Sequence, residues 1–241
     1  MLNIAVIYEE QGQFQKAIST NKEALAICRT FNNKFEESQV LINLASNYIN
    51  LSKTDTAIIL LNQALIIHDD YQKKTGLASA LKHMGKAYEK RKQFNRAIDY
   101  YFQALSIYEE LEEKRSIAET ITLIGENLLE KGKTQDALEY FYQSLDVSSA
   151  IGARKEILNN FKFLSLGYAS LQNFDSASKY IAHYTSLNDS INVTKTTIKG
   201  SGQPNLSSTD NIKKYRWGLI IATVFILLLL IRLIWRKNRL R

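Results

Sequence analysis

The sequence of 241 residues has few residues that interrupt helices or crosslink a chain: ten glycines, one proline and one cysteine. Because glycine and proline are the strongest helix breakers, their scarcity favours long helices with short connections and disfavours an all-β fold. A single cysteine, Cys28, excludes an intrachain disulfide, and its apolar surroundings predict a small core residue. The composition therefore predicts an all-α protein.

Residues that commonly carry catalysis or hold metals are also sparse. His68, His83 and His183 are the only histidines, and none has a second metal ligand three or four residues away. The sequence contains no phosphate-binding loop, no dinucleotide-binding glycine pattern and no nucleophile elbow. We therefore expect no enzymatic activity, no cofactor and no bound metal.

Acidic residues are missing from the C-terminal end. All 24 lie at or before Asp210, whereas eight of the 31 basic residues follow it. The first 212 residues thus carry 23 basic and 24 acidic side chains, although the whole chain has a formal net charge of +7. This distribution argues against a nucleic-acid partner, because the basic excess lies only beside an apolar run, as is typical of membrane-interface anchors.

The sequence repeats itself with a period of forty residues and no gaps. A small residue recurs in the first half of each repeat, and an invariant alanine recurs in the second half. The small residues are Ala5, Ala45, Gly85, Gly125 and Ser165, and the alanines are Ala17, Ala57, Ala97, Ala137 and Ala177. Such self-similarity is the mark of a repeat architecture, in which one unit cannot bury its apolar face alone and neighbouring units stack.

Each repeat has the pattern of a helical hairpin. In the third repeat an amphipathic stripe runs along the second helix, formed by Ala97, Tyr101, Ala104, Leu105 and Tyr108. Small residues at Gly85 and Ala97 would allow two antiparallel helices to cross closely, and we expect Tyr88 to fill the space beside this crossing.

The small residue, the tyrosine three positions later and the two spaced alanines resemble the tetratricopeptide repeat. The period of forty residues is similar to the longer-helix variant of kinesin light chains and many bacterial regulators. The resemblance implies a right-handed α-solenoid of five hairpins. Their expected bounds are 1–30, 36–70, 77–110, 117–150 and 157–185.

Two different segments follow the repeats. Residues 186–212 are rich in Ser, Thr, Asn and Gly and are expected to form a flexible linker, with a short helix over Ser186–Val193 as an open alternative. Residues 213–241 contain the apolar run Trp217–Trp235, in which thirteen of nineteen residues are Leu, Ile, Val or Phe. A helix of this length spans roughly 28 Å, close to the ~30 Å hydrocarbon core, and therefore predicts a transmembrane helix.

The side of the membrane on which the repeats lie is left open. Slightly more basic residues follow the apolar run than precede it, which favours a cytoplasmic C-terminus. No signal peptide precedes the repeats, which favours cytoplasmic repeats. One resolution is that the chain is a fragment of a longer protein. Localisation is expected to be single-pass in a bacterial inner membrane.

The resemblance implies that the first helix of each hairpin lines a concave groove that binds a protein or peptide. The candidate groove residues are Asn43, Ser46, Asn50, Lys82, His83, Lys86, Lys90 and Glu126, and the same face is expected to show Ile42, Ile49 and Thr122. Three lysines one turn apart suit an acidic peptide or carboxylate, although the same stripe could be an ordinary solvated helix face. The pattern departs from the known carboxylate clamp, because Lys86 stands where asparagine would be expected.

Two functions fit these observations. The first is a membrane-anchored scaffold for protein–protein interactions. The second is the input portion of a bacterial signal-transduction protein, since repeats followed by a transmembrane helix are similar to the front half of sensor histidine kinases and membrane-bound transcription regulators. Sequence beyond Arg241 would discriminate between them, because an output domain would follow there.

Overall fold

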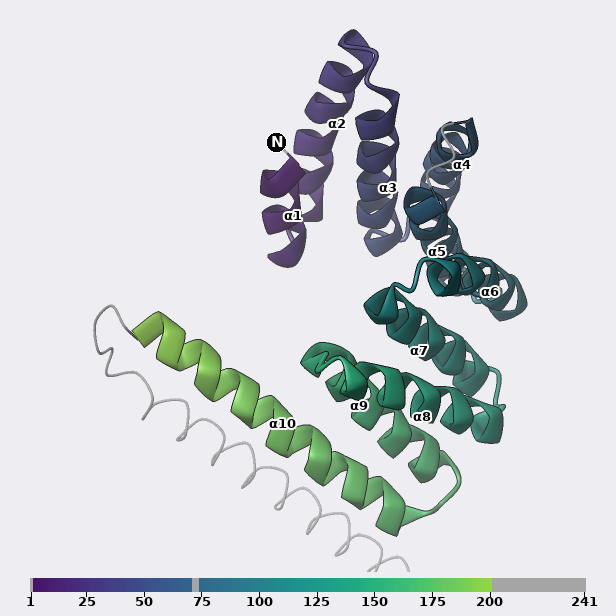
Figure 1. Cartoon of the computed structure of the whole chain (residues 1–241), viewed down its shortest axis with the longest axis vertical. Helices are drawn as coiled ribbons and strands as arrows, with labels where there is room; N and C mark the ends of the chain where they lie inside the picture. The colour runs from purple at the N-terminus through teal and green to yellow at the C-terminus, as the bar shows by residue number, and fades with distance from the viewer. Residues whose placement is uncertain (1, 71–73, 201–241) are drawn as a thin grey trace, which may run out of the picture. The chain divides into compact units, whose positions relative to one another are not determined.

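The computed structural model describes residues 2–70 and 74–200, and these residues form ten helices and no strand (Figure 1). The helices are α1 (Leu2–Glu10), α2 (Phe14–Thr30), α3 (Lys34–Asn50), α4 (Thr54–Asp70), α5 (Lys74–Lys90), α6 (Phe94–Glu110), α7 (Lys114–Glu130), α8 (Thr134–Ala150), α9 (Arg154–Ser170) and α10 (Phe174–Gly200). The predicted all-α class and the succession of helical hairpins are confirmed. The later hairpins begin two or three residues before the predicted bounds, for example at Lys34 and Lys74.

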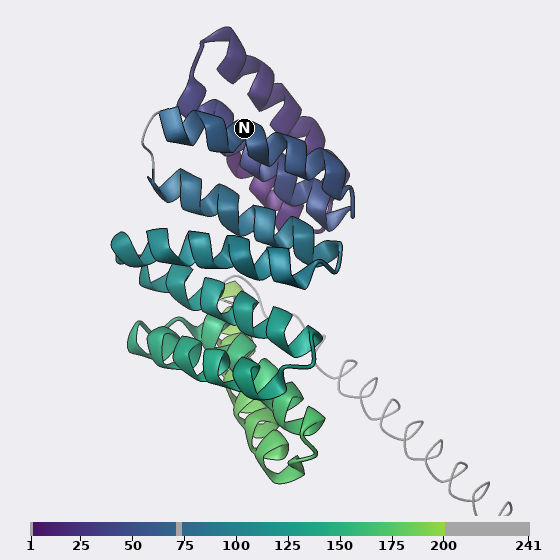
Figure 2. The ribbon, with the colours of Figure 1, turned by 90° about the vertical axis from the view of Figure 1, so that its right-hand side faces the viewer.

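From α1 to α9, each helix packs against its neighbours in the chain, and successive hairpins lie side by side in a stack (Figure 2). The first helices of adjacent hairpins also touch directly, as α3 does with α5 and α7 with α9. This arrangement places the candidate groove residues on a series of neighbouring first helices.

In each turn between helices that the structure describes, residues 71–73 being outside it, three residues connect the helices and the middle one adopts a left-handed backbone. Gly12 and Gly132 have φ angles of 70° and 76°. Lys92 occupies the same turn position in the third hairpin with a φ angle of 58°, a conformation that costs more for a residue with a side chain.

The recurring small residues make room for large side chains of the second helices. An added Cβ at Gly85 would lie 2.4 Å from Cε1 of Tyr101, and one at Gly125 would lie 2.7 Å from Cε1 of Phe141. Both aromatic side chains are fully buried. Tyr101, rather than the expected Tyr88, therefore fills the closest crossing. Tyr88 stacks on another ring, that of Tyr100, with centroids 5.3 Å apart.

The predicted linker differs from the structure. The chain divides into two compact units, Met1–Asn188 and Asp189–Arg241, and α10 is helical through Gly200. The alternative of a helix over Ser186–Val193 therefore agrees with the structure, and that helix is the continuation of α10, which extends to Gly200. Serine, threonine and asparagine lower helix propensity only modestly, whereas the stronger breakers, two glycines and a proline, occur within residues 200–204.

The predicted transmembrane helix and the rest of the linker lie outside the described residues, as do all positions from 201 onward. Among the residues that the structure does describe, no helix combines the length and apolar character needed to cross a membrane.

Candidate functional site

The candidate residues of α5 form one stripe because they follow at intervals of four residues. Lys82 is buried, Lys86 is half-buried and Lys90 is exposed at the end of the helix. This gradient shows that the three lysines are not equivalent, although the sequence pattern treats them alike.

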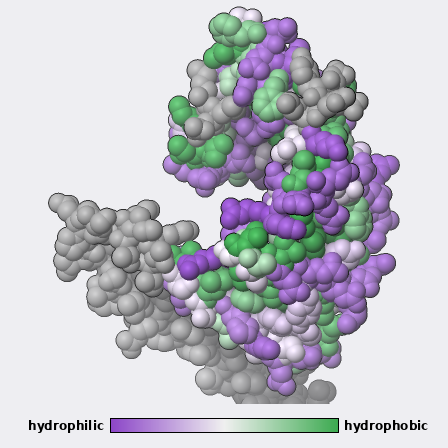
Figure 3. All heavy atoms as spheres, viewed as in Figure 1, coloured by the Kyte–Doolittle hydropathy of each residue, from purple (hydrophilic) through white to green (hydrophobic). Residues whose placement is uncertain are grey.

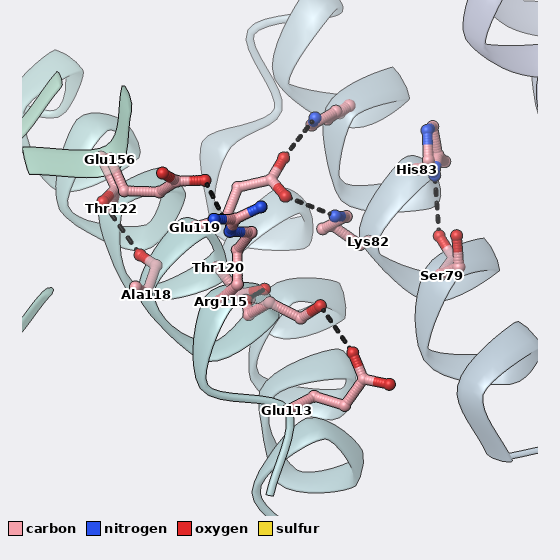
Figure 4. Close-up of polar contacts among 12 residues, drawn as sticks. Ser79, Lys82, His83, Glu113, Arg115, Ala118, Glu119, Thr120, Thr122 and Glu156 are labelled. Carbon is pink, nitrogen blue, oxygen red and sulfur yellow. Dashed lines mark hydrogen bonds and ion pairs between the residues drawn. The ribbon is translucent and has the colours of Figure 1, made fainter. Parts of the chain in front are cut away.

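Two of these lysines share one carboxylate on the next first helix. Lys82 Nζ donates to Oε2 of Glu119 at 2.7 Å, and Lys86 Nζ donates to Oε1 of the same residue at 3.1 Å. Figure 4 shows the carboxylate of Glu119 directed from α7 toward Lys82 on α5. We call Lys82, Lys86 and Glu119 the lysine–glutamate cluster. It links the third and fourth hairpins.

The cluster perturbs the protonation of its members. Burial alone would raise the pKa of Glu119, but the two lysines outweigh it and lower this pKa to about 2. Burial lowers the pKa of Lys82, and the attraction of Glu119 opposes that change. Near neutral pH, Glu119 is therefore a carboxylate whose charge is already matched inside the protein.

His83 is held neutral beside the cluster. Burial, followed by the charges of Lys86 and Lys82, lowers its pKa to about 3. Its Nδ1 lies 2.8 Å from the carbonyl oxygen of Ser79, so this nitrogen carries the proton and donates (Figure 4). His83 therefore adds no positive charge to the surface at physiological pH.

Glu126 lies on α7, on the C-terminal side of Glu119. Burial and the nearby carboxylates of Glu89 and Glu130 raise its pKa to about 7. Glu126 and Lys86 both line a pocket of about 290 Å³, whose further walls include Asn159 and Phe163 of α9. The half-buried carboxyl can therefore change its charge near neutral pH.

The α3 candidates have different surroundings. The hydroxyl of Ser46 donates to Oε1 of Glu9 at 2.8 Å, which ties α3 to α1. Asn43 is half-buried, and its carbonyl oxygen accepts a hydrogen bond from Asn47 at 2.8 Å. Asn50 is exposed at the end of the helix. The structure thus brings Lys82, His83, Lys86 and Glu126 into one electrostatic neighbourhood that does not include these three.

Three residues expected on the exposed face are buried. Ile42 and Ile49 belong to the hydrophobic core. Thr122 lies in a buried polar network, with its hydroxyl 2.8 Å from that of Ser144 and 3.1 Å from Oδ1 of Asn160. These expectations are wrong because neighbouring helices cover the three side chains: α8 and α9 cover Thr122, and Ile42 and Ile49 pack in a cluster with residues of α4 and α5.

Sequence reasoning missed Glu119, which forms ion pairs with two lysines of the stripe, Lys82 and Lys86. Glu119 stands three residues before Thr122 and therefore shares its helix face, and Gln39, Ser79 and Asn159 occupy the same repeat position. The helical spacing could have indicated this column as part of the surface.

The surface shown in Figure 3 mixes hydrophilic side chains with smaller hydrophobic patches. Within residues 2–70 and 74–200, no group of three or more His, Cys, Asp or Glu side chains could hold a metal ion. The described side chains of the candidate site offer ion pairing, hydrogen bonding and one carboxyl with a pKa of about 7.

Solved structures of similar fold cover most of the chain. BtubC from P. vanneervenii has a TM-score of 0.66 and 18% identity, covering 83% of this chain and 80% of that one. A signal transduction ATPase with a tetratricopeptide repeat sensor, from Pyrococcus horikoshii, has a TM-score of 0.70 and 20% identity, covering 81% of this chain and 30% of that one. A Rap protein complexed with Competence and Sporulation Factor has a TM-score of 0.60 and 14% identity, covering 78% and 62%.

No protein of curated function matches the chain. A family model described as tetratricopeptide repeat matches residues 1–70, 36–110 and 76–150, and these overlapping matches span more than half of the sequence. The helical hairpins, the small–aromatic crossings and these matches agree, and the chain belongs to the tetratricopeptide repeat family.

Proposed function

We propose that this chain is a membrane-anchored scaffold that binds a peptide or protein segment along the first helices of its hairpins. The observation that carries the proposal is the lysine–glutamate cluster and its adjoining pocket, which present charged and polar groups from three neighbouring first helices. Tetratricopeptide arrays are binding modules, and the similar Rap protein was solved in complex with Competence and Sporulation Factor.

The charges favour a ligand segment that carries both signs. Lys82 and Lys86 are already paired with Glu119, so an acidic group of the ligand meets Lys90 more readily. Within the described residues Glu126 forms no ion pair, and it offers a partner to a basic group of the ligand. This refines the expectation of a purely acidic ligand.

Membrane attachment is proposed from sequence alone. The apolar run Trp217–Trp235 is long enough to cross the hydrocarbon core and is flanked on both sides by basic residues. Reporter fusions at each terminus, one active only in the cytoplasm and one only outside it, test this anchor. Opposite activities at the two ends support a single span, and identical activities contradict it.

Peptide selection tests the binding function. The full chain in phospholipid nanodiscs would be used to select from a random-peptide display library, and the dissociation constants of enriched peptides would be measured. The double variant Lys90→Glu/Glu126→Lys is expected to weaken them about tenfold, because charged groups at such surfaces contribute ~1–2 kcal/mol. Failure to enrich any peptide above an unrelated membrane protein would contradict the proposal.

A matched control separates the candidate surface from general charge effects. The variant Lys22→Glu/Glu139→Lys makes the same two charge exchanges, but at exposed positions on the second helices α2 and α8. This variant should retain full affinity. Equal loss in both double variants would place binding elsewhere on the molecule.

A second function, the input portion of a signal-transduction protein, rests on the order of repeats, apolar run and basic tail. The similar Pyrococcus horikoshii protein is described as carrying a tetratricopeptide repeat sensor. The reporter fusions also bear on this choice: repeats outside the cytoplasm favour a sensor, and repeats inside favour a cytoplasmic scaffold.

A further inference from the structure

Six basic side chains gather along one edge of the stacked hairpins. Because successive helices alternate in direction, the turns inside the hairpins share one edge and the connections between hairpins share the other (Figure 2). We call residues 88–97 and 128–137, at the turns of the third and fourth hairpins, the turn edge. The two turns touch, since Lys131 Nζ donates to Oδ1 of Asn95. The basic residues of the turn edge are Lys90, Arg91, Lys92, Arg96, Lys131 and Lys133.

Charges of opposite sign are separated across the width of these two hairpins. The turn edge contains six basic and three acidic residues, a net charge of +3. The connection between the same hairpins, residues 108–117, contains two basic and four acidic residues, a net charge of −2. A flat anionic surface can meet the turn edge without approaching this acidic connection, whereas an anionic chain that wraps around the hairpins would meet both.

Three of the basic side chains surround an open cleft between the two turns. The cleft has a volume of about 490 Å³, and its walls include Lys92, Arg96, Lys131 and the ring of Phe94. All three cations are exposed. Their convergence on one cleft suits a phosphate group, because ammonium groups attract its charge and a guanidinium can donate two parallel hydrogen bonds to its oxygens.

The fold leaves the three cations of the cleft without an opposite charge. Within residues 2–70 and 74–200, Lys92, Arg96 and Lys131 form no ion pair, whereas Lys133 beside them pairs with Asp136 at 3.7 Å. Arg96 and Lys131 donate to side-chain amide oxygens, which are neutral. Like charges held together repel one another, so an anion placed between them is attracted by all three.

The turn of the fifth hairpin adds apolar side chains to the same edge. Leu171 and Phe174 are 45% and 67% exposed, and they stand at the repeat positions that hold Lys131 and Thr134 in the fourth hairpin. At a membrane interface, cations meet the lipid headgroups and apolar side chains enter the boundary of the acyl chains. The combination therefore favours a lipid over a nucleic acid, because a nucleic-acid backbone offers no apolar layer.

We propose that the turn edge docks on an anionic phospholipid surface, with a lipid phosphate held in the cleft by Lys92, Arg96 and Lys131. This docking rests on the proposed function, because membrane attachment brings the lipid close, but it can be tested apart from it. The docked array would lie with its third to fifth hairpins against the membrane and with the acidic connection turned away.

A fluorescent label on the turn edge tests the docking in lipid nanodiscs. The full chain carries the label at Gln135→Cys, which is exposed, and Cys28→Ser removes the native thiol. The discs contain lipids with a nitroxide quencher on the headgroup. Quenching should be strong in discs containing phosphatidylglycerol and weak in discs of phosphatidylcholine, and it should fall at about 1 M salt, where the Debye length is about 3 Å. A label at Ser149→Cys, exposed on the opposite edge, should show little quenching in either.

Variants assign the docking to the cleft and to its apolar neighbours. Lys92→Gln/Arg96→Gln/Lys131→Gln should lower the ratio of docked to undocked chains about a hundredfold, since each basic residue near an anionic leaflet contributes about fivefold. Leu171→Ser/Phe174→Ser should lower it about tenfold, because less apolar surface is buried. Circular dichroism checks that each variant folds, and the comparison of the two lipids needs no change in the cleft.

The matched control is Lys22→Gln/Lys114→Gln/Arg115→Gln, which also removes two lysines and one arginine at exposed positions and should keep the native quenching. Equal quenching in the two kinds of disc, or equal loss in both triple variants, overturns the proposal. Complete release of the label by single-stranded RNA at an equal concentration of phosphate would assign the edge to nucleic acid and overturn it as well.

The two proposals can fail separately. Quenching by added phosphatidylglycerol vesicles, together with reporter fusions that place both termini on one side, would contradict the membrane anchor alone. Reporter fusions that support a single span, together with an unquenched label in anionic discs, would overturn the docking alone.

Discussion

At the scale of single residues, the side chains at two positions of each repeat are related in size: one is small, and the other fills the space beside it. The small residue of each first helix lies sixteen positions before a residue of the second helix, and in the third and fourth hairpins these two residues pack against each other. Gly85 is matched with Tyr101 and Gly125 with Phe141, whereas in the second hairpin the larger Ala45 stands with Leu61. Glycine therefore appears where the partner is an aromatic ring that lies against the helix backbone.

Gly85→Ala is predicted to destabilise the protein even though alanine has the higher helix propensity. The new Cβ would lie 2.4 Å from the ring of Tyr101, and overpacking of this kind costs ~1–3 kcal/mol, more than the ~1 kcal/mol gained in propensity. Urea unfolding followed by circular dichroism would measure the change. Gly167→Ala is the control, because its nearest obstacle is the end of the flexible Leu138 side chain.

The double variant Gly85→Ala/Tyr101→Leu reproduces the pair found in the second hairpin. It should be more stable than the sum of the two single changes implies, because the smaller side chain removes the clash. Strict additivity would show that the matched columns do not interact.

Glu126 predicts a pH dependence of stability. Its pKa in the folded chain is about 7, above its ordinary value of 4.5, so the folded state binds more protons between these values. Stability from this group is therefore full below pH 4.5 and falls as pH rises to about 7, by roughly 1–3 kcal/mol. Urea unfolding of Glu126→Gln across this range should show a flatter profile. A profile parallel to that of the unmodified chain would contradict the shift.

At the scale of helices, a polar contact joins adjacent hairpins at every second junction. Asn127 Nδ2 donates to Oε2 of Glu89 at 2.9 Å, and Tyr101 donates its hydroxyl to the same oxygen at 2.7 Å. The equivalent residues of the first two hairpins, Asn47 and Glu9, make the same contact at 3.4 Å. Between the second and third hairpins the two positions hold Ile49 and Ala87, which share a hydrophobic cluster. Polar and apolar contacts thus alternate along these three junctions.

Glu89→Leu should destabilise the junction between the third and fourth hairpins. The change leaves the Tyr101 hydroxyl without its acceptor and leaves Asn127 Nδ2 with only the carbonyl oxygen of Leu123, at a cost of about 1–3 kcal/mol. It should also lower the pKa of Glu126, because the Glu89 charge helps to raise it. Urea unfolding and a ¹³C-glutamate titration measure the two effects. Glu89→Ile/Asn127→Ala, which copies the apolar junction, should recover part of the stability, and no recovery would argue against equivalent junctions.

At the scale of the whole molecule, stability arises between neighbouring hairpins. Stacked repeats contact only their neighbours, so a defect acts on the units beside it. Ala97 is fully buried at the centre of the described array, whereas Ala177 lies in α10, at the end of the last hairpin. A substitution by leucine at Ala97 should therefore disturb more hairpins than the same substitution at Ala177.

Ala97→Leu is predicted to loosen both of the hairpins that flank α6, whereas Ala177→Leu should affect mainly α8 to α10. Overpacking forces backbone shifts that cost ~1–3 kcal/mol at either site, and in the centre they disturb two junctions. Hydrogen exchange measured by mass spectrometry would report each helix separately. Identical exchange profiles for the two variants would show that the array unfolds as one unit.

Much of the candidate site could not be predicted, because its contacts cross hairpins. Lys82 and Glu119 lie 37 positions apart, and only the stacking of α5 on α7 makes them partners. The sequence placed the lysines on one helix face but could not show that two of them share a carboxylate there.

The sequence by itself determined the helical class, the forty-residue period, the hairpins and their family. These features are encoded locally, in the spacing of small, aromatic and apolar residues. Because the period recurs five times, it can be recognised even where a single repeat departs from the pattern. Only the tertiary structure decided which side chains stay exposed. Ile42 and Thr122 are covered by neighbouring helices, and Tyr101 rather than Tyr88 fills the crossing. Burial depends on the angle and depth at which helices stack, and these are set by all the contacting side chains together.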